Sequence, residues 1–369
     1  MTMDEELLVH YRLRLQPGER ADDKARGIAL EQTAELPARC VPEALLATHV
    51  GQVRSLEPVS DGTFTASIAY APELAGGETT QLLNLLFGNI SMKAGIRITG
   101  IDWPASLLEH FRGPAFGIDG LRQLTGVTEK RPLTCTALKP VGADAGELAA
   151  LTRAFARGGV DIIKDDHGLA DQPSAPYLER LQACQQAVTA ANRENGCNSL
   201  YFPNATAGPA DLADRLAAAR DAGCAGVLLS PWLSGMDSLR LARDRYGLAV
   251  LAHPAMTGSY FADGHGLDPA VMLGDLFRVA GADAVIYPNA GGRFGFSQAT
   301  CESINHALRR PLGALRGAMP APGGGMDVRR AAHWIECYGP DTMVLIGGSL
   351  YADGDLTAAT RALLTTLGR

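Results

Sequence analysis

The sequence predicts an α/β protein in which a small α+β domain, residues 1–125, precedes a C-terminal (β/α)8 TIM barrel, residues 126–369. The length of 369 residues exceeds the roughly 250 that a barrel takes. The first third mixes strand and helix patterns without regular alternation, which is typical of an α+β domain. From about residue 130, short β-rich runs alternate with Ala-rich helical stretches eight times. A doubly wound open sheet is the alternative.

In the N-terminal domain, apolar and polar residues alternate over Leu7–Leu15, which predicts a strand. Further strands are expected at Gly51–Arg54 and Thr63–Tyr70. Apolar residues at helical spacing predict helices over Lys24–Glu35 and Thr79–Phe87.

The barrel strands are expected in eight short runs. They are Thr134–Leu138, Val160–Ile163, Ser199–Phe202, Gly226–Leu229, Ala249–Ala252, Ala284–Tyr287, Gly317–Pro320 and Val344–Ile346. Helices are expected between them, among others at Ala145–Arg157, Ala175–Asn195, Pro209–Ala222 and Pro269–Ala280.

Composition excludes several classes of partner. A net charge of −7 with no block of Lys or Arg argues against nucleic acid and against an anionic membrane. No apolar run approaches the roughly 18 residues needed to span a bilayer. The first twenty residues lack the apolar core of a signal peptide, so a cytoplasmic protein is expected. The seven scattered cysteines are expected to be reduced thiols.

A barrel carries its active site at the carboxyl ends of its strands. The residues expected there are chemically active or glycine. They are Lys139, Lys164-Asp165-Asp166-His167, Asn204, Ser230, His253, Asn289, Gly323-Gly324-Gly325 and Gly347-Gly348. This pattern predicts an enzyme site.

The segment Lys164–His167 is the densest cluster and predicts a metal site. Asp and His supply oxygen and imidazole ligands, and Mg²⁺ accepts few protein ligands. Alternate residues of a strand share a face, so Lys164 and Asp166 are expected side by side. Carbamylation by CO₂ would turn Lys164 from a cation into an anionic ligand. The alternative is a solvated loop in which the lysine pairs with an aspartate.

Two basic residues beside prolines are candidates for proton transfer. Lys139 near a metal and other cations could have a lowered pKa and move protons; the alternative is an exposed loop lysine. His253 is the second candidate, with a core histidine as its alternative.

Glycine turns follow the last two strands. Gly323–Gly325 and Gly347-Gly348 occupy positions at which barrels frequently bind phosphate through backbone N–H groups, although ordinary turns remain possible. Gly291-Gly292-Arg293 could form a mobile lid with an arginine at its tip, or a plain surface loop.

These residues together resemble the RuBisCO large-chain superfamily. Residues 158–167 (GGVDIIKDDH) resemble the family's GG-x-D-F-x-K-D-D-E segment, and residues 136–140 (TALKP) its T-x-x-K-P. Residues 204–208 (NATAG) match N-A-T-A-G, and residues 253–256 (HPAM) resemble H-R-A-M. The similarity extends to residues 11–18 (YRLRLQPG) of the first domain.

The resemblance implies a role for each matching residue. Carbamylated Lys164, Asp166 and His167 would bind Mg²⁺, Lys139 would transfer protons, and His253 would lie beside the substrate. Arg293 would belong to the lid over the active site. The phosphate would be bound by Gly324, Gly325, Gly347 and Gly348. Glu31 and Asn89 match residues that the family's first domain offers to a partner subunit's site, which implies a homodimer with shared active sites.

Departures from the pattern argue against a bisphosphate carboxylase. The second lysine of K-P-K is Val141, and the arginine after the histidine is Pro254. The lid lysine is Arg293, and the region near Thr33 lacks the family's T-W pair. We therefore expect a RuBisCO-like protein that acts on a monophosphorylated keto compound.

Three functions are compatible with the sequence. The short chain, the KDDH segment and the polar lid favour decarboxylation of a 3-oxo sugar-acid phosphate of the 3-oxo-isoapionate 4-phosphate type, through a metal-stabilised enediolate. An enolase or isomerase of a methylthio-pentulose-type phosphate is the first alternative. A non-catalytic regulator that binds a sugar phosphate is the second.

Overall fold

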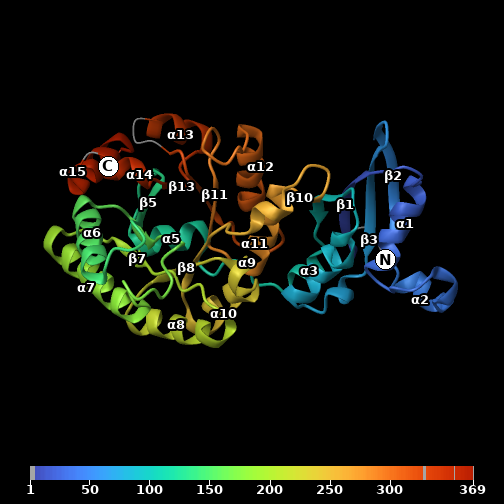
Figure 1. Ribbon diagram of the computed structural model, residues 1–369, viewed down its shortest axis with the longest axis horizontal. Coiled ribbons are helices and arrows are strands. Elements are labelled where there is room, and N and C mark those ends of the chain that lie inside the picture. Colours follow the sequence, from blue (N-terminus) through green and yellow to red (C-terminus); the bar gives the residue numbers. More distant parts are fainter. Residues whose placement is uncertain (1–4, 327–329, 353, 369) are drawn as a thin grey trace. The chain divides into compact units, whose positions relative to one another are not determined.

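The structure, a computed structural model, describes residues 5–326, 330–352 and 354–368 (Figure 1). The chain forms two compact units. The first comprises Met1–Arg112, Met256–Val279 and Pro311–Leu315, and the second comprises Gly113–Ala255, Ala280–Arg310 and Arg316–Arg369. Residues 113–125 thus belong with the second unit, whereas the sequence analysis assigns them to the first domain. The reason is apolar packing, because Leu121 of α5 (Gly117–Thr125) belongs to the core of the second unit.

The first unit contains a five-stranded sheet in the order β10-β4-β1-β3-β2. The strands are β10 (Gly266–Leu267), β4 (Ile96–Asp102), β1 (Leu7–Arg14), β3 (Thr63–Tyr70) and β2 (Gln52–Ser60). Its helices and turns are α1 (Ala21–Glu31), η2 (Ala38–Cys40), α2 (Glu43–Thr48), η3 (Pro72–Ala75), α3 (Thr79–Phe87), η4 (Asn89–Met92), α4 (Ala105–Leu108), η5 (Thr257–Tyr260) and η6 (Ala270–Leu276). Alternate residues of β1 are buried, as the period of two requires. The predicted α+β composition is confirmed, although α1 ends at Glu31 and not at Glu35.

The second unit is a parallel eight-stranded sheet in the order β7-β6-β5-β13-β12-β11-β9-β8. Its strands are β5 (Leu133–Leu138), β6 (Ile162–Asp165), β7 (Leu200–Phe202), β8 (Gly226–Leu229), β9 (Ala249–Ala252), β11 (Ala284–Pro288), β12 (Met319–Gly323) and β13 (Met343–Leu345). The two ends of the sheet meet just after β7, where Leu228 N donates to Pro203 O (2.9 Å) and Ala205 N to Leu228 O (3.1 Å). The sheet is therefore a barrel, as predicted, and not an open doubly wound sheet.

Helices follow the strands of this unit, as expected for a (β/α)8 barrel (Figure 1). They are α6 (Ala145–Gly158), α7 (Tyr177–Asn195), α8 (Pro209–Asp221), α9 (Pro231–Ser234), α10 (Asp237–Tyr246), α12 (Gln298–Arg309), α13 (Ala331–Tyr338), α14 (Gly348–Tyr351) and α15 (Leu356–Thr366). The short helix α11 (Phe277–Ala280) spans the boundary between the two units, since the first unit includes residues up to Val279. Helix α6 begins with a capping box, in which Glu147 N donates to Asp144 Oδ1 (2.8 Å) and Asp144 N to Glu147 Oε2 (2.9 Å).

The buried core of the barrel shows which residues of its strands face inward. The core includes Ile162 of β6, Leu251 of β9, Ile286 of β11 and Ala321 of β12. Because side chains alternate along a strand, Lys164, His253 and Pro288 continue these inward faces toward the carboxyl ends.

Two predicted strands are displaced along the chain. Strand β6 begins at Ile162 and not at Val160, because Asp161 is held before the strand: its carboxylate accepts from Thr134 N (2.7 Å) and pairs with Arg131 (2.7 Å). Strand β12 begins at Met319 and not at Gly317, because Ala318 N donates to Leu308 O (3.0 Å) beside α12. The shift in β6 places Lys164 inside the strand.

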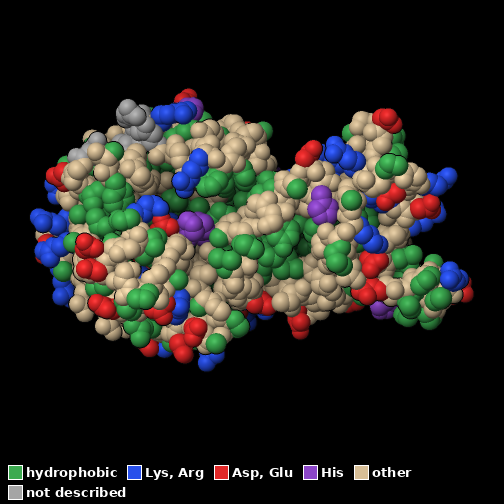
Figure 2. Space-filling model, viewed as in Figure 1, with side chains coloured by type: hydrophobic (Ala, Val, Ile, Leu, Met, Phe, Trp, Pro, Cys, Tyr) green, Lys and Arg blue, Asp and Glu red, His purple; other side chains and the backbone are tan. Residues whose placement is uncertain are grey.

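No helix of the described residues is long and apolar enough to cross a membrane. Figure 2 shows acidic and basic side chains interspersed over the visible surface. This agrees with the absence of a Lys/Arg block in the sequence.

Candidate active site

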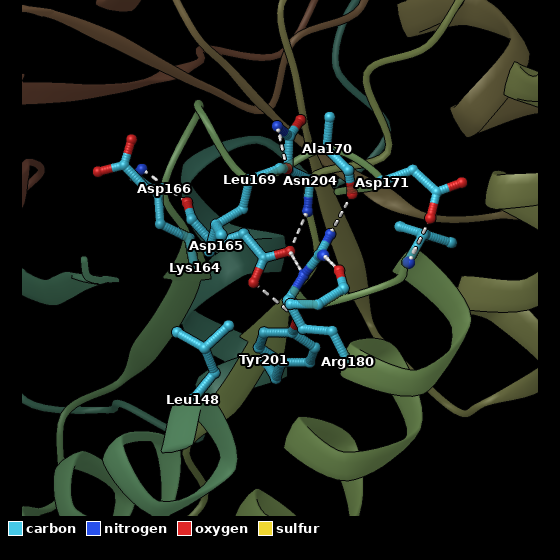
Figure 3. A network of polar contacts seen from close by, with 12 residues as sticks. Leu148, Lys164, Asp165, Asp166, Leu169, Ala170, Asp171, Arg180, Tyr201 and Asn204 are labelled. Atoms are coloured by element: carbon cyan, nitrogen blue, oxygen red, sulfur yellow. Dashed lines mark hydrogen bonds and ion pairs between the residues drawn. The ribbon is translucent and has the colours of Figure 1, made fainter. Parts of the chain in front are cut away.

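Strand β6 presents its charged residues to opposite sides. Lys164 follows the inward-facing Ile162 and pairs in register with Ala137 and Phe202 of the neighbouring strands. Asp165 points away from the barrel interior toward Arg180 and Tyr201 (Figure 3). Lys164 and Asp166 therefore share a side, as the strand periodicity predicts.

Three polar side chains meet just above β5 and β6. The Lys139 ammonium pairs with Asp166 Oδ2, and His167 Nδ1 lies 2.9 Å from Asp166 Oδ1. The Asp166 carboxylate is buried, while Lys139 and His167 are about half exposed. Burial, followed by the charge of Arg293, lowers the pKa of Lys139. The structure thus brings Lys139, Asp166 and His167 together, as predicted.

Lys164 is a buried amine without a carboxylate partner. Only 3% of its surface is exposed, and Nζ donates to the backbone oxygen of Asp165 at 3.0 Å. Among the described residues, no acidic side chain forms an ion pair with it. Burial is the main reason that the pKa of Lys164 falls to about 8; the charge of Lys139 adds to this shift, and Cys135 and Asp165 oppose it. A buried, unpaired ammonium is costly, so the neutral amine that reacts with CO₂ is readily available.

His253 and His167 stack face to face across the barrel mouth. Their ring centroids are 4.2 Å apart and the rings are inclined by 12°. Burial, followed by the charge of Lys164, lowers the pKa of both rings, that of His253 well below the usual value. Ala255 N donates to His253 Nδ1 (3.2 Å), so the proton of the neutral ring lies on Nε2.

Lys164, Asp166 and His167 could together bind a hard divalent cation if Lys164 is carbamylated. Asp166 Oδ1 and His167 Nδ1 already converge, but the described residues contain no group of three His, Cys, Asp or Glu that could hold a metal. Carbamylated Lys164 would be the third ligand. The unpaired, buried amine is the observation that supports this assignment, because the modification would replace its charge with oxygen ligands suited to Mg²⁺.

A buried polar network holds the loop that carries the candidate ligands (Figure 3). The fully buried Asp165 accepts from Arg180 Nε (3.0 Å), Tyr201 OH (2.7 Å) and Asn204 N (2.9 Å). Asn204 Nδ2 in turn donates to the backbone oxygens of His167 (3.0 Å) and Leu169 (2.9 Å). The network fixes the backbone of the loop that follows β6, and with it the position of Asp166 and His167.

The glycine turns lie where the sequence predicts them, after β12 and β13. Gly324 and Gly325 have φ angles of 77° and 81°, which favour glycine. A Cβ on Gly325 would lie 2.7 Å from Cα of Gly292, so the predicted lid loop packs on this turn. A Cβ on Gly347 would lie 3.9 Å from Lys139 Cε, whereas one on Gly348 would meet open space. The turn at Gly347 therefore lies beside Lys139.

In the first unit, Glu31 and Asn89 lie side by side. Asn89 Nδ2 donates to Glu31 Oε1 (3.2 Å), and Lys93 Nζ donates to Glu31 Oε2 (2.9 Å). Hydrogen bonds from Lys93 and Asn89 lower the pKa of the partly exposed Glu31 carboxyl. Lys93, four residues after Asn89, is a member of this cluster that its sequence pattern did not indicate.

One further residue was missed in the predicted site. Arg180 lies within α7, and nothing in its local sequence separates it from the helix's other charged residues. Ser230, expected at the end of β8, has a buried Oγ with no hydrogen-bond partner within the described part of the chain.

Comparison with known proteins gives the family. The family model of the ribulose bisphosphate carboxylase large chain, catalytic domain, matches residues 117–361. The chain is 38% identical over 368 residues, 99% of its length and 97% of the relative's, to the 5-methylthioribulose-1-phosphate isomerase of Rhodospirillum rubrum. It is 30% identical over 352 residues, 90% of its length and 84% of the relative's, to the 2,3-diketo-5-methylthiopentyl-1-phosphate enolase of Geobacillus kaustophilus.

Solved structures agree with the sequence comparison. The RuBisCO-like protein from Rhodopseudomonas palustris superposes with a TM-score of 0.88 at 36% identity, covering 99% of each chain. The dimeric archaeal RuBisCO from Hyperthermus butylicus gives 0.90 at 25% identity, covering 100% of this chain and 91% of that one. The chain therefore belongs to the RuBisCO large-chain family. Within it, the chain is a RuBisCO-like protein.

Proposed function

We propose that this protein is a metal-dependent isomerase that moves a carbonyl group along a ketose monophosphate of the 5-methylthioribulose 1-phosphate type. The observation that carries the proposal is the 38% identity, over 99% of the chain, to the relative that bears this isomerase name. The names of the relatives favour the isomerase and enolase alternative over the decarboxylation that the sequence analysis put first.

The geometry around Lys139 supports a reaction based on proton transfer. Lys139 is partly exposed at the barrel mouth and is paired with the buried Asp166, so its amine is held in one place. A positioned amine next to a ketose can remove a proton from the carbon beside the carbonyl and return it to the adjacent carbon. Both proton transfers leave the number of carbon atoms unchanged, as an isomerisation requires.

The second part of the proposal concerns charge stabilisation. When bound to carbamylated Lys164, Asp166 and His167, Mg²⁺ would polarise the substrate's carbonyl oxygen and stabilise the developing enediolate. Asn204 supports the candidate metal site without being a ligand. Its side-chain amide donates a hydrogen bond to the backbone oxygen of His167, in the loop that carries the candidate ligands. The stacked, neutral His253 adds no cation next to the metal ligands.

Substrate binding is the third part. Gly324, Gly325, Gly347 and Gly348 would offer backbone N–H groups to a single phosphate, and Arg293 would cover it. We assign the phosphate to these turns because glycine leaves the backbone accessible and because Gly347 lies beside Lys139. One phosphate site is what a ketose monophosphate needs.

Product analysis tests the proposal. The enzyme, incubated with Mg²⁺ and bicarbonate, is given 5-methylthioribulose 1-phosphate, a 2,3-diketo-5-methylthiopentyl 1-phosphate and a 3-oxo sugar-acid phosphate. We expect a new ketose phosphate from the first substrate and no CO₂ from the third. Enolisation of the diketone alone would favour the enolase function, and CO₂ release from the oxo acid alone would restore the decarboxylase. Binding without turnover of any of the three would indicate a regulator.

A homodimer with shared active sites is part of the same proposal. The Glu31–Asn89–Lys93 cluster is partly exposed, and solved RuBisCO relatives include a dimer and an octamer. Complementation tests it: inactive Glu31→Gln and Lys164→Met proteins are mixed and allowed to exchange subunits. We expect part of the activity to return, because a mixed dimer contains one site with both residues intact. No recovery despite proven subunit exchange would rule out sharing.

A further inference from the structure

We propose that Tyr351 is a positioning residue, which fixes Lys139 for proton transfer and lets the chain leave the barrel sheet at Gly347-Gly348. The inference rests on the proposed function in one respect, which is that Lys139 moves the proton. It adds the residue that holds Lys139 in place. Tyr351 is the last residue of α14, the short helix that begins at Gly348.

The Tyr351 hydroxyl binds the backbone at the end of β5. It accepts a hydrogen bond from Lys139 N (3.0 Å) and donates one to Ala137 O (2.9 Å). Burial raises the pKa of Tyr351 to about 12, so the hydroxyl keeps the proton that it donates. Its ring packs edge-on against Phe155 of α6, with 5.5 Å between the ring centroids. The ring and the hydroxyl are therefore both held.

The strand beside β5 ends before it reaches these backbone groups. Strands β5 and β13 pair in parallel, and Ile346 N donates to Cys135 O (2.9 Å) just after the end of β13. The hydrogen bonds of a parallel ladder are evenly spaced and recur every two residues. One repeat further along, the peptide of Gly348 would donate to Ala137 O and accept from Lys139 N.

The Tyr351 hydroxyl makes both of these bonds in place of the Gly348 peptide. Gly347 and Gly348 can therefore leave the ladder and form the proposed phosphate turn, while the end of β5 keeps its hydrogen bonds. Tyrosine suits this place because a phenol oxygen both donates and accepts. Without the hydroxyl, Ala137 O and Lys139 N would lose their partners, which is costly for buried backbone groups.

Lys139 is restrained at three points. Its backbone N is bound to Tyr351, its Nζ pairs with the buried Asp166, and its Cε lies 3.9 Å from the position of a Cβ on Gly347. The bond to Tyr351 sets where the side chain leaves the strand. Because misplacement of a reacting group by about 1 Å can cost roughly 100-fold in rate, loss of this bond should slow proton transfer.

Tyr351→Phe tests the proposal, because it removes the hydroxyl and keeps the ring. With 5-methylthioribulose 1-phosphate, Mg²⁺ and bicarbonate, we expect kcat to fall by about tenfold or more and KM to change little. A loosened Lys139 is also better hydrated, so its lowered pKa should rise toward the ordinary value. The ascending limb of the pH profile of kcat, which reports the neutral amine, should then move to higher pH.

Tyr177→Phe is the matched control. The Tyr177 hydroxyl also donates to a backbone oxygen, that of Arg215 (2.9 Å), but it joins α7 to α8 and not β5 to α14. Its loss should change neither kcat nor the pH profile. Equal losses in the two variants would overturn the proposal. So would a raised KM with wild-type kcat, or a lower kcat with an unshifted limb, in Tyr351→Phe.

Hydrogen exchange separates failure of this inference from failure of the proposed function. If wild type does not turn over the substrate, the proposed function fails, and exchange of the Lys139 amide, followed by mass spectrometry, decides whether Tyr351 holds this residue. Faster exchange in Tyr351→Phe but not in Tyr177→Phe supports the positioning role. Exchange at the wild-type rate in Tyr351→Phe overturns it.

Discussion

His167 and His253 stack at 4.2 Å between ring centroids, and both rings are buried enough that burial lowers their pKa. His167 lies where the related sequence pattern has a glutamate, so a carboxylate has been replaced by an aromatic ring that packs on a second ring. Two stacked imidazoles cannot both be charged without strong repulsion. The lowered pKa values favour two uncharged rings around neutral pH.

The histidine pair predicts a loss of stability in acid. A histidine whose pKa is lowered by folding binds fewer protons in the folded state than in the unfolded state. Stability is then full above the unfolded pKa of about 6.5 and falls as the pH drops below it. For the metal-free protein, we expect Tm to fall from pH 7.5 to pH 5.5, and the fall to be smaller in His253→Asn by about 2 °C or more. Equal falls in the two proteins, measured by calorimetry in EDTA, would contradict this.

The Asp165–Arg180 pair predicts a large effect on stability. Both side chains are fully buried, and Arg180→Met leaves the Asp165 carboxylate without its counter-ion. Breaking such a pair costs about 3–5 kcal/mol in the free energy of unfolding. The exposed Arg153–Glu194 pair (2.6 Å) is the control, since Arg153→Met should cost less than about 1 kcal/mol. Urea unfolding measures both; similar losses would show that Asp165 does not depend on Arg180.

The contacts of Asn204 predict an effect on metal affinity. Asn204→Ala removes the hydrogen bonds to the backbone of His167 and Leu169, so the ligand loop loses its support. Groups that orient metal ligands are typically worth about 10- to 100-fold in affinity. Calorimetric titration with Mn²⁺ in bicarbonate should show a loss of that size. Asn192→Ala is the matched control, because Asn192 bonds the backbone of Ser199 in the same way just before β7; an equal loss there would refute a specific role for Asn204.

Lys164 is predicted to carry a carbamate. Its pKa of about 8 leaves a share of neutral amine at physiological pH, and that share rises with pH. With ¹³C-bicarbonate and Mg²⁺, we expect a carbamate resonance in wild type and in Lys139→Met but not in Lys164→Met. The resonance should grow between pH 7 and pH 9. Its persistence in Lys164→Met would assign the carbamate to another amine.

The barrel was predictable from sequence because its strands are short apolar runs followed by polar residues. Lys139, Asp166 and His167 could be named because they follow such runs directly. Arg180 could not, since a charged residue inside a helix shows its buried partner only after folding. The start of β6 was misplaced for the same reason. Asp161 fits the strand pattern in sequence, and its buried ion pair with Arg131, which holds it before the strand, forms only in the folded protein. Nor could the sequence show that residues 256–279 group with the first unit.

The central claim is that Lys139, beside Asp166, removes a proton next to the carbonyl of a ketose phosphate. Solvent exchange tests it most directly: 5-methylthioribulose 1-phosphate is incubated in D₂O with the enzyme, Mg²⁺ and bicarbonate, and deuterium on the carbons next to the carbonyl is followed by NMR. We predict deuterium incorporation by wild type, and a rate lower by about 10²- to 10⁴-fold in Lys139→Ala. No incorporation by wild type, or an undiminished rate in Lys139→Ala, would contradict the account.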